Sequence, residues 1–155
     1  GWAIFSGKAN CIACHSYQHA SPFFTDSEFH NTGVAAKTGQ FPAAIHMSPS
    51  ELKRLRSEGK DLGRFNVTGY VRDLAAYRTP SLRNAALTGP YMHDGSFASL
   101  AEVVDFYAAG AIRDGYTSEK LKPLALSISE RADLVAFLES LSGDGAIAKR
   151  SASAK

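Results

Sequence analysis

Residues 11–15 read Cys11-Ile12-Ala13-Cys14-His15, which is the Cys-x-x-Cys-His pattern of c-type haem attachment. Each thiol can form a thioether with one vinyl group of the haem, and the histidine supplies an imidazole nitrogen to the iron. A disulfide or half of a zinc site would use the same thiols, but a zinc site needs further Cys or clustered His residues, and the chain has only these two cysteines. The motif therefore predicts one covalent haem c.

The composition is that of an ordinary globular domain. The 155 residues are 45% hydrophobic and 21% charged, which suffices for one domain with a packed core. The net charge of +2, with 17 basic residues among 15 acidic ones, does not favour a nucleic acid partner. No apolar run approaches the roughly 20 residues that cross a bilayer, and Gly1 begins without a leader pattern, so we expect a soluble chain that is mature or truncated. Because bacteria attach haem c outside the cytoplasm, the motif predicts a periplasmic location.

Apolar spacing and helix caps predict four helices, over residues 2–9, 48–59, 99–110 and 129–143. In the last of these, Ser129 is the expected cap and Gly143 the terminator. Residues 16–47 have no sustained period and are expected to form a loop. Because no strand pattern is convincing, the predicted fold class is mostly α with long loops. The domain is expected to span residues 1–143, followed by a disordered tail over 144–155.

Two residues compete for the second axial position of the iron. Met92 lies in a turn-rich segment, and methionine is the commonest partner of histidine in electron-carrying cytochromes c. Tyr107 shares a helical stripe with apolar residues, and spacing alone favours an inward-facing aromatic there. Met47, which follows another histidine in a loop, is a weaker third candidate.

Several polar side chains are candidates for the surroundings of the haem. His93 and Asp94 are suited to a proton pathway or to a hydrogen bond with a haem propionate; the alternative is a turn in which the aspartate caps backbone amides. Arg64, Arg78 and Arg83 are candidates for propionate pairing, because a guanidinium binds a carboxylate in bidentate fashion. A solvated surface position is the alternative for each arginine.

Five segments together resemble the C-terminal haem domain of bacterial dihaem cytochrome c peroxidases and their MauG-like relatives. They are CIACHS (11–16), TDSEFHNTG (25–33), LGRFNVTG (62–69), YRTPSLRNAALTGPYMHDGSFASLAEVVDFY (77–107) and SERADLVAFLESLSG (129–143). The fourth segment is the specific one, because the attachment motif alone fits any c-type cytochrome. The resemblance implies a class I cytochrome c-like haem domain.

The resemblance also implies an identity for the sixth iron ligand. Peroxidase members carry a ligating methionine fourteen residues after the histidine of the His-Asp-Gly segment, and counting from His93 reaches Tyr107. MauG-like members have a ligating tyrosine at that place, whereas Met92 is then a packing position. A phenolate is hard and anionic and favours Fe(III) or higher states, whereas a thioether favours Fe(II).

The remaining implications concern function. Family members carry two haem domains: peroxide reacts at the N-terminal haem, and the domain seen here relays or stores oxidising equivalents. The first hypothesis is therefore an electron-transfer domain with little peroxidase activity of its own, served by an N-terminal haem domain or separate haem-bearing chain and by a small redox protein as donor. Thr88 and Pro90 match positions whose carbonyls bind calcium. Two alternatives are a self-contained monohaem carrier ligated by His15 and Met92, and a domain that is itself the peroxidase.

Overall fold

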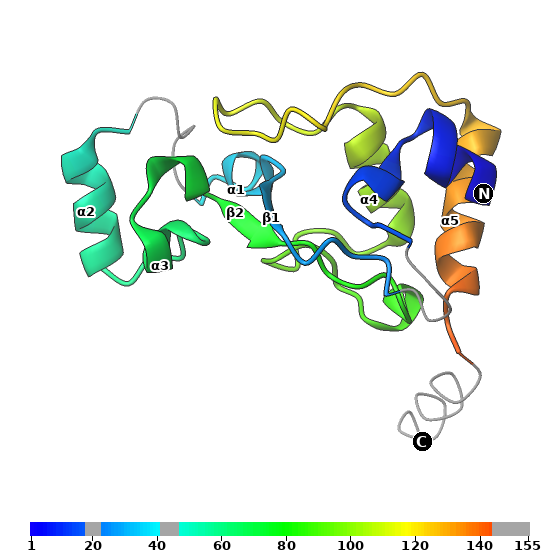
Figure 1. Ribbon diagram of the computed structural model, residues 1–155, viewed down its shortest axis with the longest axis horizontal. Coiled ribbons are helices and arrows are strands. Elements are labelled where there is room, and N and C mark those ends of the chain that lie inside the picture. The colour runs from blue at the N-terminus through cyan, green and yellow to red at the C-terminus, as the bar shows by residue number, and fades with distance from the viewer. Residues whose placement is uncertain (18–22, 41–46, 144–155) are drawn as a thin grey trace.

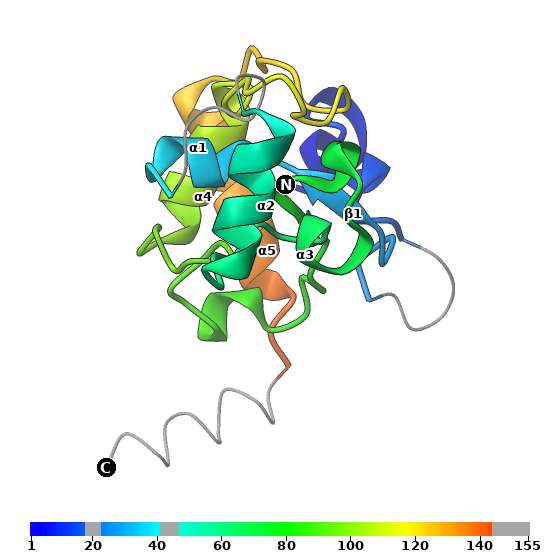
Figure 2. The same ribbon diagram turned by 90° about the vertical axis from the view of Figure 1, so that its left-hand side faces the viewer.

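The computed structural model describes residues 1–17, 23–40 and 47–143, so the predicted tail over 144–155 lies outside the described residues. Figure 1 shows two groups of helices with a small sheet between them. One group holds α4 (Leu100–Ala108) and α5 (Ile128–Ser140) beside the N-terminal turns, and the other holds α2 (Pro49–Ser57) and α3 (Phe65–Thr68). Figure 2 views the molecule from the end formed by the second group. In the described ranges no helix is long and apolar enough to cross a membrane.

The first group encloses the larger core. The π-helical turn η1 (Ile4–Lys8) and the 3₁₀ turn η2 (Cys11–Ala13) pack with α4 and α5. Their buried side chains form what we call the first core: Phe5, Ala9, Phe24, Leu100, Val104, Ala108, Leu126, Leu134 and Leu138. Cys11 and Ile12 pack against this core, so the attachment motif is fixed to its surface.

The second group has a core of its own, which α2, α3 and the short helix α1 (Val34–Lys37) enclose. We call it the second core: Ala35, Leu52, Leu62, Phe65, Leu74 and Ala75. Ser48 caps α2 through a complete capping box with Glu51, which confirms the helix start predicted from the sequence. A third cluster, of Val34, Phe97 and Phe106, lies against α4.

The predicted cap of the last helix is wrong by two residues. Ser127, not Ser129, is the N-cap of α5: its hydroxyl accepts a hydrogen bond from the Glu130 N–H, and the Glu130 carboxylate accepts one from the Ser127 N–H at 2.8 Å. The box needs a Glu or Gln three residues after the cap, and from Ser129 that position is Ala132. The helix also ends at Ser140, before the predicted terminator.

The structure adds a two-stranded sheet that the sequence did not indicate. Strands β1 (Phe29–Asn31) and β2 (Ala76–Arg78) pair antiparallel, with Phe29 opposite Arg78. Three residues are too few to show an alternating pattern, so the strands escaped prediction. The domain is nevertheless mostly helical, as expected.

A buried polar network ties the loop after α4 to the strand β1. Asp114 is only 1% exposed, and its carboxylate accepts hydrogen bonds from the Asn31 amide at 2.8 Å, the Thr117 hydroxyl at 2.8 Å and the Tyr116 N–H at 3.0 Å. The Asn31 amide also donates to the Leu74 carbonyl at 3.2 Å. One carboxylate therefore holds together segments that are far apart in the sequence.

Gly33 allows this loop to approach closely. Its N–H donates to the Asn31 side-chain oxygen at 2.7 Å, and its φ of +78° lies in the left-handed region. A Cβ at this position would lie 2.1 Å from the carbonyl oxygen of Ile112, so no larger residue fits without movement of the backbone. Val34, which follows, thereby reaches the third cluster.

Candidate haem site

The two cysteines lie half-buried at the turn η2 as free thiols. Asn10, in the left-handed region at φ +49°, starts this turn and turns the chain toward the first core. Burial raises the pKa of Cys11 to about 11 and also raises the pKa of Cys14. The nearby Lys120 ammonium acts in the opposite direction and lowers the pKa of Cys14, but burial has the larger effect. Both sulfurs are therefore neutral thiols near neutral pH, held on one short turn as attachment to two vinyl groups requires.

A backbone carbonyl holds the His15 ring in place. Its Nδ1 lies 2.9 Å from the carbonyl oxygen of Phe24, and because a carbonyl only accepts, Nδ1 carries the proton. The Nε2 lone pair is then left for a metal, and a backbone carbonyl on the other nitrogen is the usual support of a ligating imidazole. Burial lowers the pKa of His15, so the ring is neutral at physiological pH and competent to ligate.

A carboxylate and a second imidazole flank the motif. The Asp26 N–H donates to the Cys14 carbonyl at 2.7 Å, and the His30 Nε2 lies 2.8 Å from the Asp26 carboxylate. Although burial acts to raise the pKa of Asp26, the hydrogen bond from His30 and those from Glu28 and Thr79 hold it at about 2. The Cys14 sulfur and these two side chains offer three potential metal ligands within 4.8 Å of one another.

Tyr107 lies in the last turn of α4. Its ring is half-buried against the third cluster and meets Phe106 edge to face at 5.4 Å. Burial strongly raises the pKa of the Tyr107 phenol, and the Cys14 and Cys11 thiols, were they ionised, would raise it further. In this apolar setting the phenolate needs a cation beside it, and a ferric iron would supply one.

Met92 lies against the same cluster. Its backbone has a φ of +70°, and its half-buried side chain packs with Val34, Phe97 and Phe106, the cluster that also contacts Tyr107. The two residues predicted to compete for the sixth position therefore pack against the same cluster, and which of them ligates the iron stays a prediction.

The segment after Met92 is engaged locally. Asp94 accepts a hydrogen bond from the Ser96 N–H at 3.1 Å, which is the turn anticipated as the alternative. The ring of His93 stacks on Tyr77 with centroids 3.7 Å apart, and its Nε2 lies 2.9 Å from the Gln40 side-chain oxygen. Burial lowers the pKa of His93, so a neutral ring stacks on the phenol.

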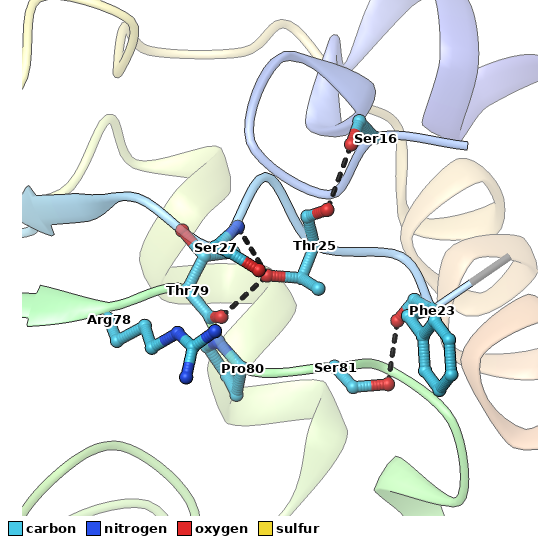
Figure 3. A pocket seen from close by; sticks show the side chains of 8 residues that line it. All are labelled: Ser16, Phe23, Thr25, Ser27, Arg78, Thr79, Pro80 and Ser81. Carbon is cyan, nitrogen blue, oxygen red and sulfur yellow. Dashed lines mark hydrogen bonds between the residues drawn. The ribbon is translucent and has the colours of Figure 1, made fainter. Parts of the chain in front are cut away.

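A cavity of about 640 Å³ opens beside the segment that follows the attachment motif. Figure 3 shows the eight residues that line it: Ser16, Phe23, Thr25, Ser27, Arg78, Thr79, Pro80 and Ser81. The hydroxyl of Thr25 donates to the Thr79 carbonyl at 2.7 Å, and this bond holds two segments of the wall together. Arg78 is the cationic group of the wall, suited to a carboxylate ligand.

The other residues predicted to surround the haem are dispersed. The guanidinium of Arg83 lies 5.1 Å from the ring centre of Phe23, and Arg64 pairs with Asp73 at 3.6 Å and lies 4.2 Å from the ring centre of Phe29. Thr88 and Pro90 are exposed in the turn after η5 (Ala85–Leu87), and calcium binding by their carbonyls stays a prediction.

No protein-family model matches the chain, but individual relatives do. It is 38% identical over 151 residues to the cytochrome-c peroxidase IdrP1 of Pseudomonas sp. (strain SCT), covering 92% of this chain and 39% of that protein. It is 39% identical over 148 residues to the methylamine utilization protein MauG of Methylorubrum extorquens, covering 94% of this chain and 35% of that protein.

Among solved structures, a MauG-like protein associated with microbial copper homeostasis aligns with a TM-score of 0.70 and 32% identity. That alignment covers 94% of this chain and 46% of the other. The chain thus spans less than half the length of each of these proteins.

Proposed function

Because the chain is homologous to one part of the dihaem cytochrome c peroxidases and MauG proteins, we propose that it is a haem c electron-transfer domain of such an oxidoreductase, with a cytochrome c-like fold. Its role is to relay or store oxidising equivalents for peroxide-dependent chemistry at a partner haem. The partner haem belongs to an N-terminal domain or a separate chain, electrons come from a small redox protein, and the assembly works in the periplasm. Structural calcium at Thr88 and Pro90 belongs to the same proposal.

The proposal depends above all on the position of the Tyr107 phenol. This phenol packs from α4 against the third cluster and its pKa is raised by burial, while His15 offers its Nε2 from the attachment turn itself. Bound here, haem c supplies a one-electron redox centre. The chain holds it through thioethers at Cys11 and Cys14 and ligates its iron through His15 and Tyr107. Because His15 and Tyr107 would both ligate the iron, peroxide would have no open coordination position, and we expect little peroxidase activity from this chain alone.

The tyrosine gives the site its redox character. Burial keeps the free phenol protonated, so Tyr107 would have to release its phenolic proton in order to ligate a metal. An anionic oxygen then stabilises the oxidised metal, which suits storage of oxidising equivalents. Arg78, and Arg83 beside Phe23, are proposed to face the propionates.

One observation favours a second function. Met92 packs against the same cluster as Tyr107, so His15 and Met92 could ligate the iron of a self-contained monohaem electron carrier. Such a protein would have a higher potential and no dependence on a partner haem.

The two functions are separated by spectra and redox titration of the haem-loaded chain, its Tyr107→Phe variant and its Met92→Leu variant. We expect one covalent haem, a low potential and a ferric tyrosinate spectrum, lost in Tyr107→Phe and kept in Met92→Leu. A potential well above zero with a methionine-sulfur band that only Met92→Leu abolishes would establish the carrier instead. High-spin ferric haem that reacts rapidly with peroxide would make the domain itself a peroxidase.

A further inference from the structure

A lysine from the loop between α4 and α5 contacts the attachment turn. The Lys120 ammonium donates to the Ala13 carbonyl at 3.0 Å, and its nitrogen lies 3.7 Å from Oδ2 of Asp26. Ala13 lies between the two cysteines, so the ammonium binds to the motif itself. The Lys120 side chain is 45% exposed and that of Asp26 only 16%. Two opposite charges therefore lie beside the residues that would hold the haem.

The backbone of the loop keeps Lys120 in this place. The Ser118 N–H donates to the Asn31 carbonyl of β1 at 2.9 Å, and the Leu121 N–H donates to the Ser118 carbonyl at 3.1 Å. The Arg113 guanidinium donates to the carbonyls of Ser118 and Leu121, at 3.4 Å each. Because these bonds fix the turn on both sides of Lys120, only the lysine side chain has to be ordered for the ammonium to reach Ala13.

Asp26 is fixed from several directions. Its N–H donates to the Cys14 carbonyl at 2.7 Å, and its carboxylate accepts hydrogen bonds from the Glu28 N–H at 3.0 Å and from the His30 Nε2 at 2.8 Å. With a pKa of about 2, the carboxyl group is an anion at physiological pH. The negative charge of the pair thus has a defined place against the attachment turn.

The two charges act in opposite senses on the haem-binding side chains. Burial raises the pKa of Cys14 most, and the remaining effects are a lowering by Lys120 and a rise by Asp26. Burial lowers the pKa of His15, and Asp26 acts against that change. Ferric iron carries one more positive charge than ferrous iron, so a nearby cation disfavours the ferric state and a nearby anion favours it.

We propose that Lys120 and Asp26 set the reduction potential of the haem attached at residues 11–15, with Lys120 raising the potential and Asp26 lowering it. This inference rests on the covalent haem of the function proposed above, but it holds for either candidate sixth ligand. An anionic Tyr107 would by itself lower the potential. Lys120 offsets part of that lowering, so that a small redox protein can still reduce the iron.

The test is redox titration of the haem-loaded chain and its variants at one pH and low ionic strength. Lys120→Gln removes the positive charge and Lys120→Arg keeps it. Asp26→Asn removes the negative charge with little change of shape, and the double variant removes both charges. Lys122→Gln is the matched control, because Lys122 is exposed in the same loop and has no hydrogen bond or ion pair to any described residue.

We expect the potential to fall in Lys120→Gln, to rise in Asp26→Asn and to lie between these two in the double variant. Each single change should alter the ferric-to-ferrous equilibrium several-fold, whereas Lys120→Arg and Lys122→Gln should stay close to the wild type. Added salt should reduce the difference between the wild type and Lys120→Gln, because the lysine is half-exposed and its charge is screened.

A merely structural role gives a different result. A loosened attachment turn would expose the haem to water and would shift the potential in the same direction in Lys120→Gln and Asp26→Asn. Shifts of the same sign, an equal fall in Lys122→Gln, or no change in Lys120→Gln would overturn the charge pair while leaving the proposed function intact. Opposite shifts in a chain with a methionine-sulfur band would support the pair and overturn the tyrosine-ligated function. A chain without covalent haem would overturn both.

Discussion

The buried carboxylate of Asp114 gives the sharpest prediction for stability. Replacing it by alanine removes the acceptor shared by Asn31, Thr117 and the Tyr116 N–H. We expect the loop after α4 to loosen from β1 in Asp114→Ala, because no other described hydrogen bond joins Asn31 to that loop through its side chain.

The size of the expected loss in stability depends on which hydrogen-bond acceptors remain for each donor after the substitution. The Asn31 amide retains the Leu74 carbonyl and the Thr117 hydroxyl retains the Ile112 carbonyl at 2.6 Å, so only the Tyr116 N–H loses its described partner. Hydrogen bonds to a charged group contribute about 1.5–3 kcal/mol each, and removing the carboxylate also removes the cost of its dehydration. The expected loss in the free energy of unfolding is therefore on the order of 3 kcal/mol.

Urea unfolding of the haem-loaded chain measures this loss. The control is Asp105→Ala, which removes an exposed carboxylate paired with Arg131 at 2.9 Å and should cost at most about 1 kcal/mol. If Asp114→Ala unfolds within about 0.5 kcal/mol of the wild type at an unchanged m-value, the network does not stabilise the fold and the reasoning is refuted.

Three further predictions concern backbone, pH and capping. Thermal unfolding should show that Gly33→Ala destabilises the fold by on the order of 3 kcal/mol, because its Cβ would overlap the Ile112 carbonyl. In the control Gly39→Ala, where φ is +69° and the space around the position is open, the loss should be only about 1 kcal/mol. The pKa of Asp26 is about 2 against an ordinary 3.8, so its stabilisation is complete above pH 3.8 and lost as pH falls toward 2, and acid titrations of Asp26→Asn should lack that component. Ser127→Ala should cost about 1 kcal/mol and lower the helical circular dichroism signal, and no change would argue against its role as the cap.

The features that could be predicted from the sequence are those that depend on local residue patterns. The capping box at Ser48 and the apolar stripe of α4 predicted their helices, and Leu100 and Val104 of that stripe are buried, whereas Tyr107 is half-buried. The sequence could not predict that the Phe24 carbonyl orients His15, because every residue has a backbone carbonyl and the residue type does not show which one is used. Nor could it pair Asn31 with Asp114, since that contact depends on the folded path of the whole chain.

The separation of the two main cores has a consequence for maturation. Cys11 packs on the first core and Tyr107 on the third cluster, and neither packs against the second core, which of the three candidates for the sixth position only Met47 contacts in the described residues. Amide protons around Leu52 and Leu62 should therefore exchange slowly even before the prosthetic group is installed, while those near the thiols gain protection only afterwards. On the proposed function, a chain that has not yet received haem would thus present its attachment turn from a partly ordered scaffold.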